Sequence, residues 1–188
     1  IREVEQCLEW SRQRPIEWLL HNHQVDNRWC LVHATHMTEN ETVSLAKSGA
    51  VAGLCPTTEA NLGDGLFPLT GYMEQTGVMG IGSDSNTTVD AAEEMRMLEY
   101  GQRLRLKQRN IASTGEGLST GASLFEALLR GGSLALSQPI GTIIEGRRAD
   151  MIVLDTKHPV LAGRSGDAIL DTWIFAGGRD LIKDVFVS

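Results

Sequence analysis

The sequence predicts an α/β fold in which a parallel β-sheet is followed by a smaller β-rich segment. Three short apolar runs without helical periodicity alternate with segments whose apolar residues recur at helical spacing. This alternation is typical of a parallel sheet, because each helix returns the chain to the edge where the next strand starts. After Pro139 the pattern changes to short apolar runs. We therefore expect one domain over residues 1–138 and part of a second, β-rich domain over residues 139–188.

Two helices are predicted ahead of the first strand. Apolar residues recur at helical spacing over residues 4–20, and Pro15 stands where a second helix can begin, because proline favours the first turn of a helix. Residues 29–33 then form an apolar run with no helical period. Such a run favours a strand buried on both faces.

The second strand is predicted over residues 50–54, after a helix that begins at Thr38. Glu41 follows Thr38 by three residues, which is the spacing at which a capping residue and a carboxylate exchange hydrogen bonds. Gly49 suits the end of this helix. The Gly-rich residues 61–65 predict a turn after the second strand.

The third strand is predicted over residues 78–82, after a short helix near residues 68–75. A long helix over residues 89–108 follows, and a further helix over residues 123–136 is interrupted by Gly131-Gly132. The residues of the long helix expected to face the core are Met95, Leu98 and Leu104. Four strands are predicted in the C-terminal segment, over residues 142–144, 151–154, 172–175 and 184–187.

The composition excludes several classes of partner. Asp and Glu (24) outnumber Lys and Arg (17), giving a net charge of −7, whereas nucleic acids and anionic membranes require a positive surface. No apolar run approaches the roughly 20 residues that a membrane helix needs. The three cysteines are too few for a disulfide framework, which favours a reducing compartment. We expect a cytoplasmic protein that binds a small-molecule substrate and neither nucleic acid nor membrane.

His33 and Asp84 are the strongest candidate site residues. His33 ends the first predicted strand and Asp84 follows the third, and parallel α/β folds bind ligands at the carboxyl ends of their strands. If the sheet forms a barrel, both side chains point into the same mouth, where an imidazole and a carboxylate can hold a metal ion or move protons. Taken singly, His33 also fits a structural histidine and Asp84 a helix cap. His36, three residues after His33, is interpreted as a support for the same loop.

Two other motifs are weaker candidates. His21 and His23 have the spacing of a zinc-binding HxH pair, but they lie at a predicted helix end, where polar residues complement the helix dipole. Gly80 and Gly82 resemble the start of a dinucleotide-binding motif, but Ser85 stands in place of its third glycine. We therefore interpret the histidine pair as a helix end and the two glycines as sites of close strand packing.

Three segments resemble the deaminase branch of the amidohydrolase superfamily. The first, Arg28-Trp29-Cys30-Leu31-Val32-His33-Ala34-Thr35-His36, resembles the sixth barrel strand with its catalytic histidine. The second, Ser83-Asp84 after Gly80-Ile81-Gly82, resembles the eighth strand with its metal-binding aspartate. The third runs from Ile140-Gly141-Thr142 through Glu145-Gly146-Arg147-Arg148-Ala149-Asp150 to Leu154-Asp155 and resembles the return of the chain into the small β-sandwich domain.

Within that branch the sequence is similar to the formimidoylglutamate deiminases. This similarity rests on Thr58-Glu59-Ala60-Asn61-Leu62-Gly63-Asp64-Gly65, where purine and triazine deaminases usually show Pro-Asn or Ser-Asn, on residues 98–105 and on residues 175–178. The implied fold is the C-terminal part of a (β/α)8 TIM-type barrel, about strands six to eight, followed by part of a small β-sandwich domain. A complete barrel takes about 250 residues, and the family's first-strand HxH pair and fifth-strand His and Glu have no counterpart here. We therefore expect a C-terminal portion of a longer enzyme.

The resemblance also implies a reaction, the zinc-dependent hydrolysis of N-formimino-L-glutamate to N-formyl-L-glutamate and ammonia in histidine degradation. Three histidines and Asp84 would hold the zinc ion, Asp84 would accept a proton from the attacking water, and His33 would hydrogen-bond the hydroxide or the tetrahedral centre. The intact enzyme is expected to be a homodimer, and these 188 residues alone to be inactive. The alternatives are a deaminase for a purine, a cytosine-like ring or S-adenosylhomocysteine, and a non-catalytic α/β ligand-binding module.

Overall fold

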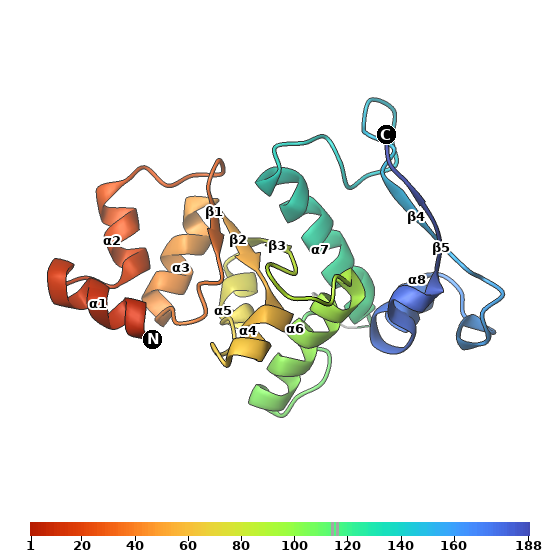
Figure 1. The fold of residues 1–188 in the computed structure, drawn as a ribbon, viewed down its shortest axis with the longest axis horizontal. Helices are drawn as coiled ribbons and strands as arrows, with labels where there is room; N and C mark the ends of the chain where they lie inside the picture. Colours follow the sequence, from red (N-terminus) through yellow and green to blue (C-terminus); the bar gives the residue numbers. More distant parts are fainter. Residues whose placement is uncertain (114, 116) are drawn as a thin grey trace.

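The two N-terminal helices lie where the sequence predicts them. The computed structural model describes residues 1–113, 115 and 117–188, and in it helix α1 spans Arg2–Ser11 and helix α2 spans Pro15–Asn22. Pro15 opens α2, where its missing N–H costs no intrahelical hydrogen bond. The two helices pack together at one end of the molecule (Figure 1), with the rings of Trp10 and Trp18 edge to face at 5.3 Å.

Three parallel strands form the sheet that carries the candidate site. Strand β1 spans Cys30–Val32, β2 spans Val51–Leu54 and β3 spans Val78–Ile81, in the spatial order β1, β2, β3. The register brings the carboxyl ends of all three strands to the same edge of the sheet. The predicted α/β fold with a parallel sheet is therefore confirmed.

Strand β1 differs from the prediction in its burial. A strand buried on both faces was expected, but Val32 is 54% exposed. In the described part of the chain β1 is an edge strand that pairs only with β2, so one side of it has no neighbour to cover it. The central strand β2 is the buried one, with Val51, Ala52 and Leu54 fully enclosed.

Helix α3, Glu39–Ser48, begins and ends as its sequence predicts. The hydroxyl of Thr38 accepts a hydrogen bond from the Glu41 N–H, and the carboxylate of Glu41 accepts one from the Thr38 N–H at 2.8 Å. The helix ends at Gly49, whose φ of 79° lies in the left-handed region that favours glycine. This reciprocal cap fixes the start of α3 just after the loop that leaves β1.

Two helices connect β2 to β3, and the sequence predicted only the second. Helix α4 spans Pro56–Leu62 and α5 spans Leu69–Glu74. The turn expected over residues 61–65 is wrong in its first two positions, which belong to α4, and the chain turns at Gly63 with φ 69°. A helix of two turns is too short to show periodicity, so α4 leaves little trace in the hydrophobic pattern.

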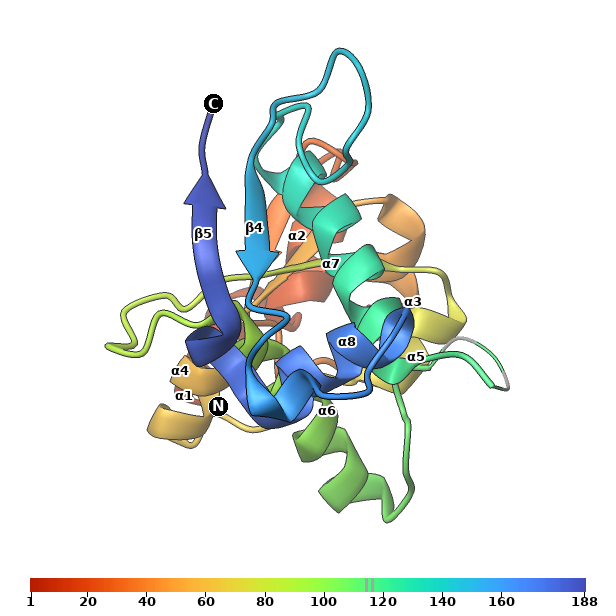
Figure 2. The same ribbon diagram turned by 90° about the vertical axis from the view of Figure 1, so that its right-hand side faces the viewer.

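Helix α6, Ala91–Leu106, confirms two of its three predicted core residues. Met95 and Leu98 are buried, whereas Leu104 is 82% exposed. Leu104 lies nine residues beyond Met95, which at about 100° per residue places it on the opposite face of the helix, near the end of α6 that points downward in Figure 2. Gln102, on the same face as Met95, is buried. The prediction for Leu104 is therefore wrong.

Helix α7, Thr120–Ala135, runs through the glycine pair that was expected to interrupt it. A Cβ added to Gly131 would lie 1.8 Å from the carbonyl oxygen of Met79 in β3. The glycine is therefore a contact point that lets α7 lie directly against the sheet, as Figure 1 shows. Close packing, and not a break, is the reason for a glycine here.

The C-terminal segment contains two of the four predicted strands. Strands β4, Met151–Leu154, and β5, Ile182–Phe186, form an antiparallel pair. Residues 142–144 form no strand, and residues 172–175 are helical, shared between α8, Asp167–Thr172, and the π-helix η2, Trp173–Gly177. Short 3₁₀ helices, η1 and η3, span Pro159–Leu161 and Gly178–Leu181.

The residues mistaken for a strand are apolar because they enter the core. Trp173 and Ile174 are buried, and the ring of Trp173 meets that of Phe125 of α7 edge to face at 5.5 Å. Arg96 of α6 donates a hydrogen bond to the Ile174 carbonyl at 2.7 Å. A short apolar run cannot distinguish a buried strand from a buried helix, and here the helix is correct.

The core lies between the sheet and the helices α3, α5, α6, α7 and η2. Its fully enclosed members include Leu45, Ala52, Leu54, Leu69, Tyr72, Met95, Leu124 and Ile174. Among the helices that the structure describes, none combines the length and the apolar character needed to cross a bilayer.

Candidate active site

His33 and Asp84 lie together at the carboxyl edge of the sheet. His33 directly follows β1, and Asp84 lies three residues beyond Ile81, where β3 ends. Nε2 of His33 is 3.7 Å from Oδ2 of Asp84, and the two side chains are 40% and 39% exposed. The structure therefore brings these two predicted residues together at a position that a ligand can reach.

The backbone of both residues has an uncommon conformation. φ is 67° at His33 and 51° at Asp84, in the left-handed region where an L residue costs roughly 1 kcal/mol or more. Each strand end is still tied to β2, because the His33 N–H donates to the Gly53 carbonyl at 2.8 Å and the Gly82 N–H donates to the Leu54 carbonyl at 3.0 Å. Residues held in this region by their surroundings cluster at functional sites.

Glu59 of α4 is a member of the site that the sequence did not predict. Its Oε1 lies 3.3 Å from Nδ1 of His33 and accepts a hydrogen bond from the Cys55 N–H at 2.9 Å. The side chain is only 3% exposed, and burial raises its pKa although the hydrogen bonds from Cys55 and His33 act in the opposite direction. The only sequence feature that could have indicated Glu59 is its position five residues beyond the end of β2, near a strand end like those of His33 and Asp84.

Cys55 is the second unpredicted member. One donor atom each from His33, Cys55 and Asp84 lies within 4.8 Å of the others. Burial, followed by the nearby Glu59, Asp84 and Glu94 carboxylates, raises the pKa of the Cys55 thiol to about 12. At neutral pH the side chain is therefore a thiol and a poor nucleophile, because the thiolate is the reactive form.

The donor set of this site fits a divalent cation such as zinc. Imidazole nitrogen, carboxylate oxygen and cysteine sulfur are the three ligand types that zinc takes in proteins. In the part of the chain that the structure describes, Asp84 forms no ion pair with a Lys or Arg side chain, so its charge is free to meet a metal ion. His33 and Asp84 are also open to the solvent side, where further ligands have to approach.

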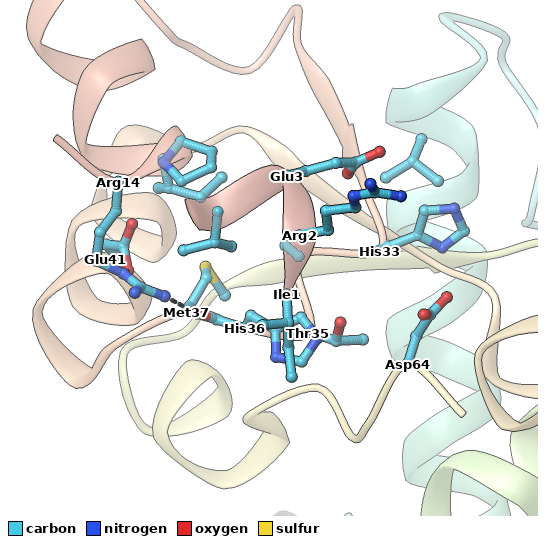
Figure 3. A pocket seen from close by; sticks show the side chains of 15 residues that line it. Ile1, Arg2, Glu3, Arg14, His33, Thr35, His36, Met37, Glu41 and Asp64 are labelled. Atoms are coloured by element: carbon cyan, nitrogen blue, oxygen red, sulfur yellow. Dashed lines mark hydrogen bonds and ion pairs between the residues drawn. The ribbon is translucent and has the colours of Figure 1, made fainter. Parts of the chain in front are cut away.

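A cavity of about 540 Å³ opens beside His33 (Figure 3). Its wall includes the start of α1 and the loop that follows β1. Nε of Arg14 lies 2.7 Å from Oε2 of Glu41, and Arg14 also donates to the backbone carbonyl of His36. Arg14 and Glu41 thereby hold the loop that carries His33, and His36 supports this loop through its backbone, as the sequence suggested.

The structure does not bring His21 and His23 to the site. His21 lies in the last turn of α2, and His23 terminates that helix. The ring of His23 packs between Trp18 and Trp29, at 5.6 and 6.1 Å. Neither histidine belongs to the cluster of possible metal ligands found among the described residues, in agreement with their interpretation as a helix end.

Comparison with known proteins places the whole chain in one family. The Amidohydrolase family profile matches residues 3–188. The chain is 52% identical over 187 residues to the formimidoylglutamate deiminase of Pseudomonas aeruginosa, an alignment that covers 100% of this chain and 41% of that protein. The chain therefore spans about two fifths of the length of this relative.

Solved structures show the same fold. An amidohydrolase from Brucella melitensis superposes with a TM-score of 0.92 at 48% identity, covering 99% of this chain and 41% of the other. An adenosine deaminase from Xanthomonas campestris with bound zinc superposes with a TM-score of 0.86 at 25% identity, covering 99% and 42%. Together with the match over residues 3–188, these similarities show that the chain belongs to the amidohydrolase family.

Proposed function

We propose that the intact protein containing this chain hydrolyses N-formimino-L-glutamate to N-formyl-L-glutamate and ammonia, the conversion that occurs in histidine degradation. The observation that carries this proposal is the juxtaposition of His33 and Asp84 at 3.7 Å in a chain that aligns along its whole length with a formimidoylglutamate deiminase. An imidazole and a carboxylate at the ends of neighbouring parallel strands are suited to move protons at one reacting atom.

This chain would supply the C-terminal part of the enzyme. Residues 1–138 correspond to about strands six to eight of a (β/α)8 barrel with their helices, and residues 139–188 to part of a small β-rich domain. The parallel order β1, β2, β3 and the antiparallel pair of β4 and β5 support this division. The free backbone edge of β1, which pairs only with β2 among the described strands, is where a preceding barrel strand would pair.

Asp84 would hold the metal ion. Its carboxylate is accessible and unpaired with Lys or Arg among the described side chains. The neighbouring His33 imidazole is a ligand type that zinc accepts, as is the Cys55 sulfur once it has lost its proton. A divalent metal at this position acts as a Lewis acid and lowers the pKa of a water molecule bound to it.

The chain's own residues would then act on water and substrate. Asp84 accepts a proton from the water that attacks the formimino carbon, and His33 hydrogen-bonds the oxygen that becomes attached to this carbon. The bond from this carbon to the terminal nitrogen then breaks. The nitrogen leaves as ammonia, having received both protons of the water, and the oxygen remains as the formyl group.

The test is ammonia release by the intact protein across a panel of N-formimino-L-glutamate, adenine, guanine, cytosine and S-adenosylhomocysteine. We expect N-formimino-L-glutamate to give the highest kcat/KM. The intact enzyme would need cationic groups to pair the two carboxylates of this substrate, and a neutral ring would leave those groups buried without partners. A higher kcat/KM for a ring substrate would overturn the substrate assignment. The absence of turnover with every compound would favour a ligand-binding module.

A further inference from the structure

The imidazole of His33 lies between two carboxylates, and only one of them faces the solvent. On one side, Nε2 is 3.7 Å from the accessible carboxylate of Asp84. On the other side, Nδ1 is 3.3 Å from Oε1 of Glu59, which is 3% exposed. The ring therefore has an outer nitrogen at the candidate reaction centre and an inner nitrogen held by a buried group.

The hydrogen bonds of Glu59 determine which nitrogen of His33 carries the proton. Its Oε1 accepts a hydrogen bond from the Cys55 N–H at 2.9 Å, so this oxygen is an acceptor with one further lone pair. A hydrogen bond from His33 to the same oxygen requires a proton on Nδ1. In the neutral imidazole the other nitrogen, Nε2, then presents a lone pair on the side of Asp84.

We propose that Glu59 is a positioning residue that fixes His33 in the Nδ1–H tautomer and aims its Nε2 at the reacting oxygen beside Asp84. This proposal rests on the proposed function for the role of Nε2 in the reaction. The tautomer itself follows from contacts within the chain and does not depend on the substrate. Glu59 is almost fully buried and reaches the candidate reaction centre through its contact with His33.

Glu94 shows that capping of α4 does not explain Glu59. Glu94 is a second buried carboxylate, 2% exposed, that accepts hydrogen bonds from the N–H and the hydroxyl of Thr57 in the first turn of α4. It serves the start of this helix without contacting His33. Glu59 uses one oxygen both for the Cys55 N–H and for His33, so it adds to the structural role a contact that reaches the site.

The direct test is the tautomer of His33 in the intact, metal-loaded protein, measured with ¹⁵N-labelled histidine by two-bond nitrogen–proton correlation. We expect the proton on Nδ1 in the wild type. A wild-type spectrum with the proton on Nε2 would overturn the proposal whatever the substrate proves to be, and a failure of the substrate assignment would leave this spectrum unchanged. The two outcomes are therefore separable.

Two substitutions of Glu59 distinguish its role as a hydrogen-bond acceptor from the role of its negative charge. A substitution of Glu94 is the matched control. Glu59→Leu removes the acceptor, and we expect loss of the Nδ1–H tautomer and a fall in kcat of about 10- to 100-fold with little change in KM. Glu59→Gln keeps an acceptor oxygen for both donors, so the tautomer is retained and kcat stays within about fivefold. Glu94→Leu loses a buried carboxylate of the same helix start, but we expect it to keep the tautomer and kcat.

Kinetics are measured on the compound of the panel with the highest kcat/KM, with metal content checked in every variant. A Glu59→Leu protein with unchanged tautomer and unchanged kcat would overturn the proposal, as would an equal loss of kcat in Glu94→Leu. If Glu59→Leu does not fold, Glu59→Gln decides the matter together with the wild-type spectrum. A Glu59→Gln protein with its proton on Nε2 and wild-type kcat would contradict the proposed role.

Discussion

Folding shifts the pKa values of buried carboxylates in opposite directions in two regions of this chain. Burial alone would raise the pKa of Glu41, but hydrogen bonds from Thr38 and the guanidinium of Arg14 outweigh it and hold the pKa below its ordinary value. At the carboxyl edge of the sheet, burial raises the pKa of both Glu59 and Glu94, and their hydrogen bonds do not offset it. Glu41 has the Arg14 guanidinium beside it. Glu59 has only His33 as an ionisable partner, and Glu94 accepts hydrogen bonds from Thr57.

This difference in pKa distinguishes a carboxylate that stabilises the fold from the carboxylates near the candidate active site. Glu41 forms an ion pair with Arg14 at the start of α2 and accepts a hydrogen bond from Thr38 after the β1 loop. Its charge therefore stabilises the fold and is not available to a ligand. Glu59, Glu94 and Asp84 lie around Cys55 and together raise the pKa of its thiol. In the described part of the chain no Lys or Arg side chain forms an ion pair with these three carboxylates. The exposed charge of Asp84 would be relieved when a cation binds, whereas Glu94 stays buried at the start of α4, where it accepts hydrogen bonds from Thr57.

The largest effect on activity is expected at Asp84, the exposed carboxylate that has no Lys or Arg partner among the described side chains. Asp84→Asn should reduce metal content and lower kcat by about 10²- to 10⁴-fold from loss of the base alone, because an amide neither anchors a cation nor accepts a proton. Metal analysis and ammonia release on the intact protein measure both losses. The double change His21→Ala and His23→Ala is the control and should leave both nearly intact. Loss of metal in the double variant would show that the helix-end histidines had been misread.

Removal of the Arg14–Glu41 ion pair should lower the stability of the fold. Arg14→Met leaves Glu41 buried without its cation and removes a donor from the His36 carbonyl, so we expect a loss of about 1–3 kcal/mol in the free energy of unfolding. Denaturant unfolding of the intact protein measures this loss. Arg28→Met is the matched control, since the Arg28–Asp26 pair is exposed to solvent and should contribute little to stability. Equal losses in the two variants would remove the distinction between a scaffold pair and a surface pair.

The smallest effect is expected from neutralising Glu94. Because burial raises the pKa of Glu94 above its ordinary 4.5, the folded chain holds this proton more tightly than the unfolded chain, and stability falls as pH rises from about 4.5 through the folded pKa. Glu94→Gln removes this penalty, so its stability relative to the wild type should rise over that range.

Glu41→Gln is the opposite case. The pKa of Glu41 is lowered in the folded state, so the charged form adds stability above the unfolded pKa that is lost as pH falls. This variant should be less stable than the wild type at neutral pH, and the deficit should shrink on acidification. The measurement is denaturant unfolding between pH 4 and pH 8. The same sign of pH dependence in both variants would abolish the contrast between the two regions.

The strand ends of this fold were predictable, whereas the contacts behind them were not. His33 and Asp84 follow apolar runs, and the geometry of parallel strands brings such positions together. Glu59 lies on the unpredicted helix α4 and reaches His33 across 26 positions of sequence, a pairing that no local pattern encodes. The core position expected for Leu104 failed because this residue lies on the face of α6 opposite Met95. The strand expected over residues 172–175 failed because a short apolar run does not distinguish a buried strand from a buried helix.

The contact between Gly131 and the Met79 carbonyl has a consequence for protein engineering. No side chain fits between α7 and β3 at this point, so the position of the helix determines the position of β3. Asp84 lies five residues beyond Met79, just after this strand. A library that randomises position 131 should return almost only glycine. A designer who transplants Asp84 into another parallel sheet would have to move β3 and α7 as one unit. A helix with a larger residue at the crossing would displace the strand, and the carboxylate would move with it.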